Sequence, residues 1–107
     1  MYKRIFVLEK HRKGGEQQAA RYGEKIVLLF KPQDQRPSIW SREFVEEAMA
    51  RLKEYEFDPN EDAFLVSGSF VPIARVITAM AVAYVSFNAL LFSATTSDYV
   101  SRRLGAA

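Results

Sequence analysis

Apolar residues along the chain gather into four short continuous runs, and segments with helical spacing separate these runs. The runs predict strands at Lys3–Glu9, Ile26–Phe30, Ala63–Val66 and Phe87–Ala94. They do not alternate between apolar and polar positions, a pattern typical of strands that are covered on both faces of a sheet. Residues 96–107 are mostly polar or small, and we predict that they form a C-terminal tail outside the sheet.

Helices are predicted between these strands. Good helix formers over Glu16–Tyr22 precede Gly23, which we expect to end the first helix in a left-handed conformation. A second helix extends from Ser38 or Ser41 to Tyr55, because apolar residues recur there at three- and four-residue spacing on one face. A serine at its start can cap the free backbone N–H groups.

A third helix is predicted over Ile73–Val85, and it is apolar on most of its sides. A sheet cannot cover such a helix alone, and large exposed apolar patches are uncommon on monomers. We therefore predict a homo-oligomer, most simply a dimer, whose interface contains four residues of this helix: Val76, Met80, Ala83 and Tyr84. The alternative is that the first helix and the C-terminal tail of the same chain cover it.

Strands and helices thus alternate in the order β-α-β-α-β-α-β, with short connections. This alternation indicates a mostly parallel sheet with right-handed crossovers and helices on both faces. We predict a single α/β domain over residues 1–107, with its core in residues 1–95 and a compact three-layer Rossmann-like or flavodoxin-like fold. The sheet has four strands, and the simplest arrangement places them in the order second, first, third, fourth.

The composition excludes several kinds of chemistry. The chain has no cysteine and one histidine, which excludes a disulfide framework, a thiolate metal site and a multi-histidine zinc site. His11 could act as a general acid or base only beside an orienting carboxylate, for which Glu9, Asp34 and Asp98 are the candidates. The sequence shows no such constellation, so we predict a protein without catalytic residues, metal or cofactor.

The charge and hydropathy patterns bear on location. The formal net charge is +2, and the apolar run Ile5–Leu8 is far too short for a secretion signal. The stretch Ile73–Phe92 contains one charged residue, Arg75, and approaches the length of a membrane span. Its pattern changes from helical to strand-like midway, so we favour a cytoplasmic protein, although hydropathy alone does not exclude a span.

The loops that follow the predicted strands are basic or rich in hydroxyl groups. In an open α/β sheet these loops meet at the carboxyl edge, where ligands bind. The N-terminus of the third helix has free backbone N–H groups that attract anions, and lysines and arginines nearby supply counter-charge. We predict an anion site formed by Ser67, Gly68, Ser69, Lys10, Arg12, Lys31 and Arg75. The alternatives are a serine-capped turn at 67–69 and a solvated loop at 10–13.

Aromatic residues argue against a nucleic-acid interface. Proteins that bind single strands usually expose aromatic rings between basic residues, so that bases can stack on them. Most phenylalanines, including Phe92, lie in predicted strands and are expected in the core. Trp40 is expected to pack against the second helix. Non-specific nucleic-acid binding is therefore the weakest of our binding hypotheses.

The segments Ala20–Leu29 and Phe64–Ile73 resemble short α/β proteins of uncharacterised function that tailed bacteriophages encode. The shared features are a Tyr-Gly turn before an apolar strand, a Pro-x-Asp loop, and a Gly-Ser turn into an alanine-rich helix. The likeness covers residues 19–92. The chain has Ser67 where that family usually has threonine and Phe70 where it has proline. The resemblance implies a Rossmann-like fold, a phage or prophage origin and the host cytoplasm, but no activity.

Residues Leu65–Ala83 are also similar to ligand-sensing Rossmann-like domains that bind cyclic oligonucleotides in bacterial immunity, often as dimers. Two function hypotheses follow. The first is a small, non-enzymatic, oligomeric phage accessory protein that binds a host or phage protein. The alternative is a binder of a nucleotide or cyclic oligonucleotide at the carboxyl edge of the sheet.

Overall fold

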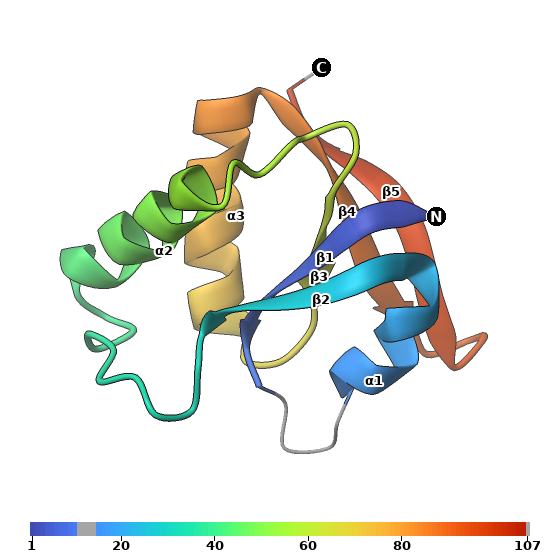
Figure 1. Ribbon diagram of the computed structural model, residues 1–107, viewed down its shortest axis with the longest axis horizontal. Coiled ribbons are helices and arrows are strands. Elements are labelled where there is room, and N and C mark those ends of the chain that lie inside the picture. Colours follow the sequence, from blue (N-terminus) through green and yellow to red (C-terminus); the bar gives the residue numbers. More distant parts are fainter. Residues whose placement is uncertain (11–14, 107) are drawn as a thin grey trace.

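The computed structural model describes residues 1–10 and 15–106. In chain order, its elements are β1 (Tyr2–Glu9), α1 (Gly15–Ala19), the 3₁₀ turn η1 (Ala20–Tyr22), β2 (Gly23–Phe30), α2 (Arg42–Glu54), β3 (Ala63–Val66), α3 (Phe70–Tyr84), β4 (Ser86–Ser93) and β5 (Asp98–Gly105). Helices α2 and α3 cover one face of the sheet, and the short α1 lies on the other face (Figure 1). The predicted α/β class is confirmed.

The strands form one mixed sheet in the order β2-β1-β3-β4-β5. The first four are parallel, and β5 runs antiparallel to β4. The order predicted for the first four strands is confirmed. The prediction of a four-stranded sheet followed by a polar tail at 96–107 is wrong, because Asp98–Gly105 is a strand that pairs along the whole of β4.

A tight reversal of the chain produces this fifth strand. The turn after β4 brings Asp98 opposite Ser93, and the ladder continues until Gly105 lies opposite Ser86. The strand has the polar composition of a sheet edge, with Arg102 and Arg103 adjacent, and charged residues at an edge discourage further pairing. That polarity made the segment resemble a tail in the sequence.

Helix α2 begins where the sequence predicts. The Ser41 hydroxyl caps it by accepting a hydrogen bond from the Phe44 backbone N–H at 3.3 Å. Phe44, Ala48 and Leu52 recur at four-residue spacing and are buried on the face that meets the sheet. Helix α3 begins earlier than predicted, at Phe70, so that its proline lies in the first turn.

Much of α3 is covered by its own chain. Two of the predicted interface residues, Val76 and Met80, are fully buried in the core between α3, α2 and the sheet. The Tyr84 ring packs on Phe57, with ring centroids 5.1 Å apart, and burial raises the pKa of its phenol. Ala83 is exposed. Of the four residues, therefore, Val76 and Met80 contact their own chain and have no surface for a partner in this structure.

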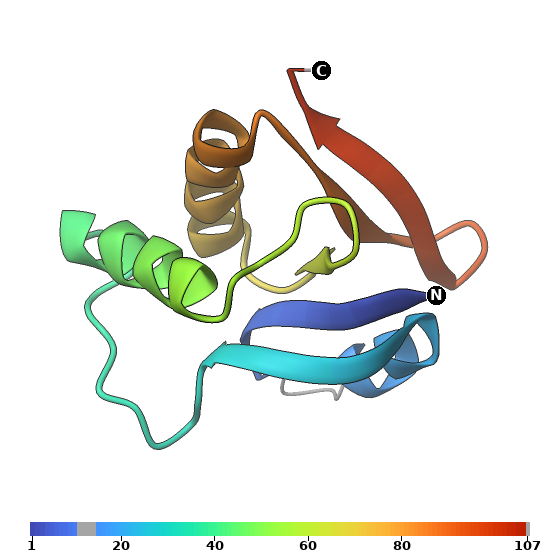
Figure 2. The same cartoon turned by 45° about the horizontal axis from the view of Figure 1, so that its top comes forward.

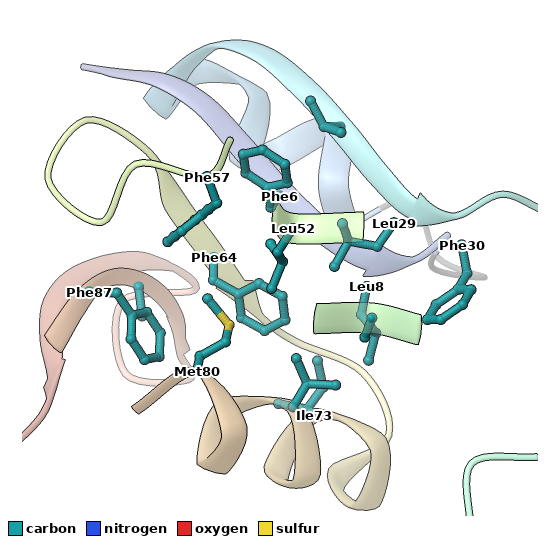
Figure 3. Close-up of a cluster of buried hydrophobic side chains, with 14 of the residues drawn as sticks. Phe6, Leu8, Leu29, Phe30, Leu52, Phe57, Phe64, Ile73, Met80 and Phe87 are labelled. Atoms are coloured by element: carbon teal, nitrogen blue, oxygen red, sulfur yellow. The ribbon is translucent and has the colours of Figure 1, made fainter. Parts of the chain in front are cut away.

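The two faces of the sheet hold separate cores. Figure 3 shows the larger one, in which aromatic and aliphatic side chains of the sheet meet α2 and α3; its largest members include Phe6, Phe30, Phe64, Phe87, Leu52 and Met80. The smaller core, on the opposite face, contains Ile5, Val7, Ala19, Ala63, Leu65, Leu90 and Tyr99. Strands β1 and β3 contribute to both cores, which explains their unbroken apolar runs.

The hairpin of β4 and β5 closes the smaller core. The Gln18 side chain donates to the Ser97 carbonyl at 2.9 Å, and the Tyr22 hydroxyl donates to Asp98 at 2.8 Å. Arg21 forms an ion pair with the same carboxylate. Figure 2 shows β5 crossing steeply over the direction of β1 and β2, as expected of a strongly twisted sheet. A curled hairpin and one short helix thus replace the full outer helical layer of the predicted sandwich.

Gly23 does not have the predicted role. Its φ of −149° and ψ of 162° are extended, and it is the first residue of β2 and not a left-handed helix cap. A β-carbon at this position would lie 2.6 Å from Cγ1 of Ile5. Close approach of β2 to β1, and not helix termination, therefore requires a glycine here.

The apolar stretch at 73–92 is divided between two elements. Helix α3 ends at Tyr84, and β4 begins at Ser86. Within residues 1–10 and 15–106, no helix is both long and apolar enough to cross a membrane.

Candidate functional site: a groove at the carboxyl edge of the sheet

An open groove of about 620 Å³ lies where β1 and β2 end. It is lined by Glu9, Lys10, Phe30, Lys31, Pro32, Asp34, Gln35 and Arg36, and we call it the β1–β2 groove. Its position agrees with the rule that ligands of open α/β sheets bind beyond the carboxyl ends of the strands. Its volume lies within the range of small-molecule sites.

The loop between β2 and α2 forms one wall of the groove, and an arginine of α2 anchors it. Asp34 closes the first turn of this loop by accepting from the Lys31 backbone N–H at 2.8 Å. Arg51 donates to the same Asp34 oxygen at 2.7 Å and to the Leu29 carbonyl at 2.5 Å. The hydrogen bond from Arg51, followed by that from the Lys31 backbone, lowers the pKa of Asp34. Asp34 is therefore a structural anion whose charge is already compensated.

A second arginine joins the loop to β1. Arg36 Nε donates to the Glu9 carboxylate at 2.5 Å, and Arg36 Nη1 donates to the Pro37 carbonyl at 3.0 Å. Its guanidinium carbon also lies 5.6 Å from the centroid of the Phe44 ring. The ion pair between Glu9 and Arg36 thus connects the two walls of the groove, and it compensates the second carboxylate.

Two lysines that line the groove have no ion-pair partner among the described residues. Lys10 follows β1, Lys31 follows β2, and both are exposed. In the part of the chain that the structure describes, their ammonium groups make no hydrogen bond or ion pair, whereas both lining carboxylates pair with arginines. The groove therefore carries two uncompensated positive charges, and it can attract an anion.

The structure brings together only part of the anion site that the sequence predicts. Lys10 and Lys31 line the same groove, as predicted. Arg75 does not: its guanidinium donates to the Ile39 carbonyl and, at 2.8 Å, to the Ser41 carbonyl. It fixes the start of α2 against α3. Arg12 and His11 lie outside the described residues.

The Ser-Gly-Ser segment forms the turn from β3 into α3 at the same edge, but it does not line the groove. Gly68 has a φ of 102° and makes this turn, and Ser67 is half-buried. Ser69 takes the N-cap position without a capping hydrogen bond from its hydroxyl. The segment therefore forms the tight turn of the alternative, with Ser69 at the N-cap position but without the hydrogen bond of a serine cap.

The predicted anion site leaves out the two arginines that organise the groove, Arg36 and Arg51. Arg36 lies in the loop after the second strand, as Lys31 does, so the rule that predicted Lys31 also applies to Arg36. Arg51 lies on α2, and no local pattern indicates that it reaches back to Asp34. Its role depends on the fold.

The carboxylates considered for catalysis do not gather. Glu9 and Asp34 both line the groove, but each pairs with its own arginine. Asp98 pairs with Arg21 on the other side of the sheet, where it also accepts from Tyr22. Across the described ranges 1–10 and 15–106, no group of His, Cys, Asp and Glu could hold a metal ion.

Three aromatic residues are exposed, and two of them, Trp40 and Phe92, were expected to be covered. Trp40 is 73% exposed instead of packing on α2, because the neighbouring Ile39 fills that place against the core. Phe92 is 51% exposed because β3 ends at the residue opposite Leu91, so that only β5 flanks it. Phe70, at the start of α3, is 81% exposed.

Comparison with known proteins gave no match: no family model fits the chain, and no curated protein or solved structure is similar to it. The functional argument therefore depends on the groove and on the exposed surfaces.

Proposed function

We propose that the chain is a non-enzymatic binding protein that takes an anionic small molecule in the β1–β2 groove. One observation carries this proposal. Lys10 and Lys31 lie in one groove without ion pairs, while arginines already compensate both carboxylates beside them. An anion with two or more oxygen acceptors would accept charge-assisted hydrogen bonds from both ammonium groups.

The surrounding contacts support a preformed site. Three arginines fix the loop that forms one wall: Arg36 through Glu9, Arg51 through Asp34, and Arg75 through the backbone carbonyls before α2. A wall that is already ordered loses little conformational entropy when a ligand binds. The two lysines do not contribute to this anchoring, and they are free to contact the ligand.

The test is unfolding in the presence of simple anions. We expect inorganic phosphate, sulfate, citrate or adenosine 5′-monophosphate to raise the unfolding temperature. A ligand at a hundred times its Kd adds about 2.7 kcal/mol to the free energy of unfolding. The double variant Lys10→Gln and Lys31→Gln should lose this stabilisation.

A matched control distinguishes anion binding in the groove from a non-specific effect of the protein's positive charge. The double variant Lys25→Gln and Lys53→Gln removes the same charge from two exposed lysines outside the groove, and it should keep the stabilisation. The proposal fails if no anion stabilises the protein at millimolar concentration. It also fails if both double variants respond equally.

Exposed aromatic residues favour a second candidate function, the binding of a protein partner or of a second copy. Trp40 and Phe70 are 73% and 81% exposed. Arg75 bonds to the carbonyls on either side of Trp40, and Phe70 precedes Arg75 by five residues, or about 7.5 Å along a helix. The two residues therefore belong to segments that meet, the loop before α2 and the first turns of α3. Exposed aromatic side chains of this kind are typical of interface anchors.

Sedimentation velocity tests this second candidate. If the two rings join copies of the chain, the wild type should dimerise with concentration, and the double variant Trp40→Ala and Phe70→Ala should not. The variant Phe92→Ala, which removes another exposed aromatic side chain, on β4, is the control. A wild type that stays monomeric would rule out the homo-oligomer. The resemblance to phage proteins would place either activity in the cytoplasm of an infected bacterium.

A further inference from the structure

We infer that the β1–β2 groove selects a phosphate monoester carried by a small molecule. The inference rests on the anion-binding function proposed above and names its ligand class. It follows from the charge of the groove, from its hydrogen-bond donors and from its size.

The charge favours a dianion. Glu9 pairs with Arg36, and Asp34 pairs with Arg51, which also pairs with Glu47, so Lys10 and Lys31 are the two lining cations without an ion pair in the described chain. A phosphate monoester carries a charge between about −1.5 and −2 at neutral pH, because its second pKa is near 6. A carboxylate or a phosphodiester carries −1 and would leave one lysine uncompensated.

The donors suit a group with three terminal oxygens. Each lysine offers an ammonium with three N–H bonds. Arg36 uses Nε and Nη1 for Glu9 and Pro37, and within the described part of the chain its Nη2 makes no hydrogen bond. The groove thus presents donors from three side chains. A monoester phosphate has three oxygens to accept from them, whereas a phosphodiester has two.

The size and the lining favour a small molecule over a polymer. The volume of about 620 Å³ is that of a small-ligand pocket. Single-stranded nucleic acid would need aromatic rings among the cations for stacking. The ring that lines the groove, Phe30, is 2% exposed, and the exposed Trp40 is not among the lining residues. Pro32 and Gln35 are left to contact the body of the ligand.

A matched ligand pair tests the inference directly. Adenosine 5′-monophosphate is a monoester, and its 3′,5′-cyclic form is a diester with the same base and sugar. By isothermal titration calorimetry at about pH 8, where the monoester is a dianion, we expect the monoester to bind at least about tenfold more tightly, since one added charge-assisted contact is worth that much. An oligonucleotide without terminal phosphates should bind more weakly than the monoester.

Lowering the pH isolates the charge of the phosphate. At about pH 5 the monoester is mostly a monoanion, so its advantage over the cyclic form should fall to about threefold or less. The charged groups that face the groove are Glu9 and Lys10 at the end of β1, and Lys31, Asp34 and Arg36 in the loop, with Arg51 and its second partner Glu47 behind Asp34. The lowered pKa of Asp34 keeps it ionised in this range.

The cyclic form reports any titration of the protein itself, that of His11 included, because its own charge does not change. An advantage that does not shrink at low pH would overturn the charge argument.

One lysine substitution links the preference to the groove. Lys31→Gln should reduce the affinity for the monoester about tenfold and that for the cyclic form much less, because only the dianion needs both lysines. Lys25→Gln removes a charge near the opposite end of β2, about 20 Å away along the strand, and should change neither affinity.

The outcomes separate the two proposals. Equal binding of the monoester and the cyclic form overturns the phosphate-monoester inference and leaves anion binding standing. Tighter binding of the oligonucleotide overturns the small-molecule part. Failure of every anion to bind overturns the proposed function as well.

Discussion

The parallel strands begin at one edge of the sheet, the amino edge, and end at the opposite one, the carboxyl edge. Positively charged side chains have different roles at these two edges. At the amino edge, Arg4 donates to Asp62 at 2.8 and 3.2 Å and to the carbonyls of Tyr55 and Glu56 at 2.7 and 3.0 Å. Arg103 there is bonded to the loop after α2 through Pro59 and Asn60. At the carboxyl edge three arginines also hold a loop, but the two lysines beside them form no ion pair within the described residues.

The difference follows from the chemistry of the two side chains. A guanidinium is a rigid planar fork that can bind a carboxylate and several carbonyls together, and it serves to fasten loops. An ammonium is a compact, strongly hydrated charge on a flexible stem. Arginines therefore fasten both edges. Exposed lysines lie near both edges as well, Lys3 and Lys25 near the amino ends of β1 and β2, but of these four lysines it is Lys10 and Lys31 that line the β1–β2 groove. Net charge alone, +2 for the chain, does not reveal this division.

The largest effect is expected at the amino edge. Asp62 is 1% exposed and holds both Arg4 and the Asp58 backbone N–H. Asp62→Ala removes a buried carboxylate from Arg4, but that guanidinium is 26% exposed and keeps two carbonyl partners, so the cost should be about 2 kcal/mol, below that of breaking a fully buried pair. Urea unfolding measures the loss. The exposed neighbour Glu61→Ala should cost less than about 0.5 kcal/mol. A loss below about 1 kcal/mol for Asp62→Ala would contradict this account.

The amino edge also shows what the sequence can predict. The sequence Asp58-Pro59-Asn60 is a local turn signal, and the Asp58 carboxylate accepts from the backbone N–H groups of Asn60 and Glu61. Turn chemistry is local, so a short segment contains it. The bond from Arg4 to Asp62 spans 58 positions and has no local signal. The strand at Asp98–Gly105 was missed for the same reason: a one-sided edge strand is defined by its partner, β4, and not by its own apolar pattern.

An intermediate effect is expected at the carboxyl edge on removal of Arg51. Arg51→Met should destabilise the protein less than Asp62→Ala, because both Arg51 and Asp34 are partly exposed. Arg51 lowers the pKa of Asp34 in the folded protein. A lowered carboxyl pKa gives stability that is present above the unfolded pKa, near about 4, and is lost as the pH falls through the folded value.

The pH dependence of the unfolding free energy tests whether Arg51 lowers the pKa of Asp34. The difference in unfolding free energy between the wild type and Arg51→Met should shrink as the pH falls from 7 to below about 4, where Asp34 becomes protonated. Urea unfolding at several pH values measures it, and Arg42→Met, on an exposed arginine of the same helix, is the control. A difference that grows on acidification would show that Asp34 is not held in its charged form.

The groove was only half predictable for a related reason. Lys10 and Lys31 were nominated because each follows a predicted strand, and parallel strands bring their carboxyl ends to one edge. Which nearby cations are already engaged depends on contacts between distant elements. Arg75 was assigned to an anion, and it instead bonds to backbone carbonyls before α2. A sequence locates the edge, but it does not show which of the charges there are paired.

The smallest effect on stability is expected for the lysines themselves. Without ligand, Lys10→Gln and Lys31→Gln together should change the free energy of unfolding by less than about 0.5 kcal/mol, because neither ammonium group bonds to the described chain. Any change should be towards greater stability, since two like charges that share a groove repel each other, and added salt should reduce the gain. Urea unfolding of the ligand-free protein at low and high salt measures both. A loss of more than about 1 kcal/mol would show that these lysines fasten the edge as the arginines do, and the contrast between the two edges would then fail.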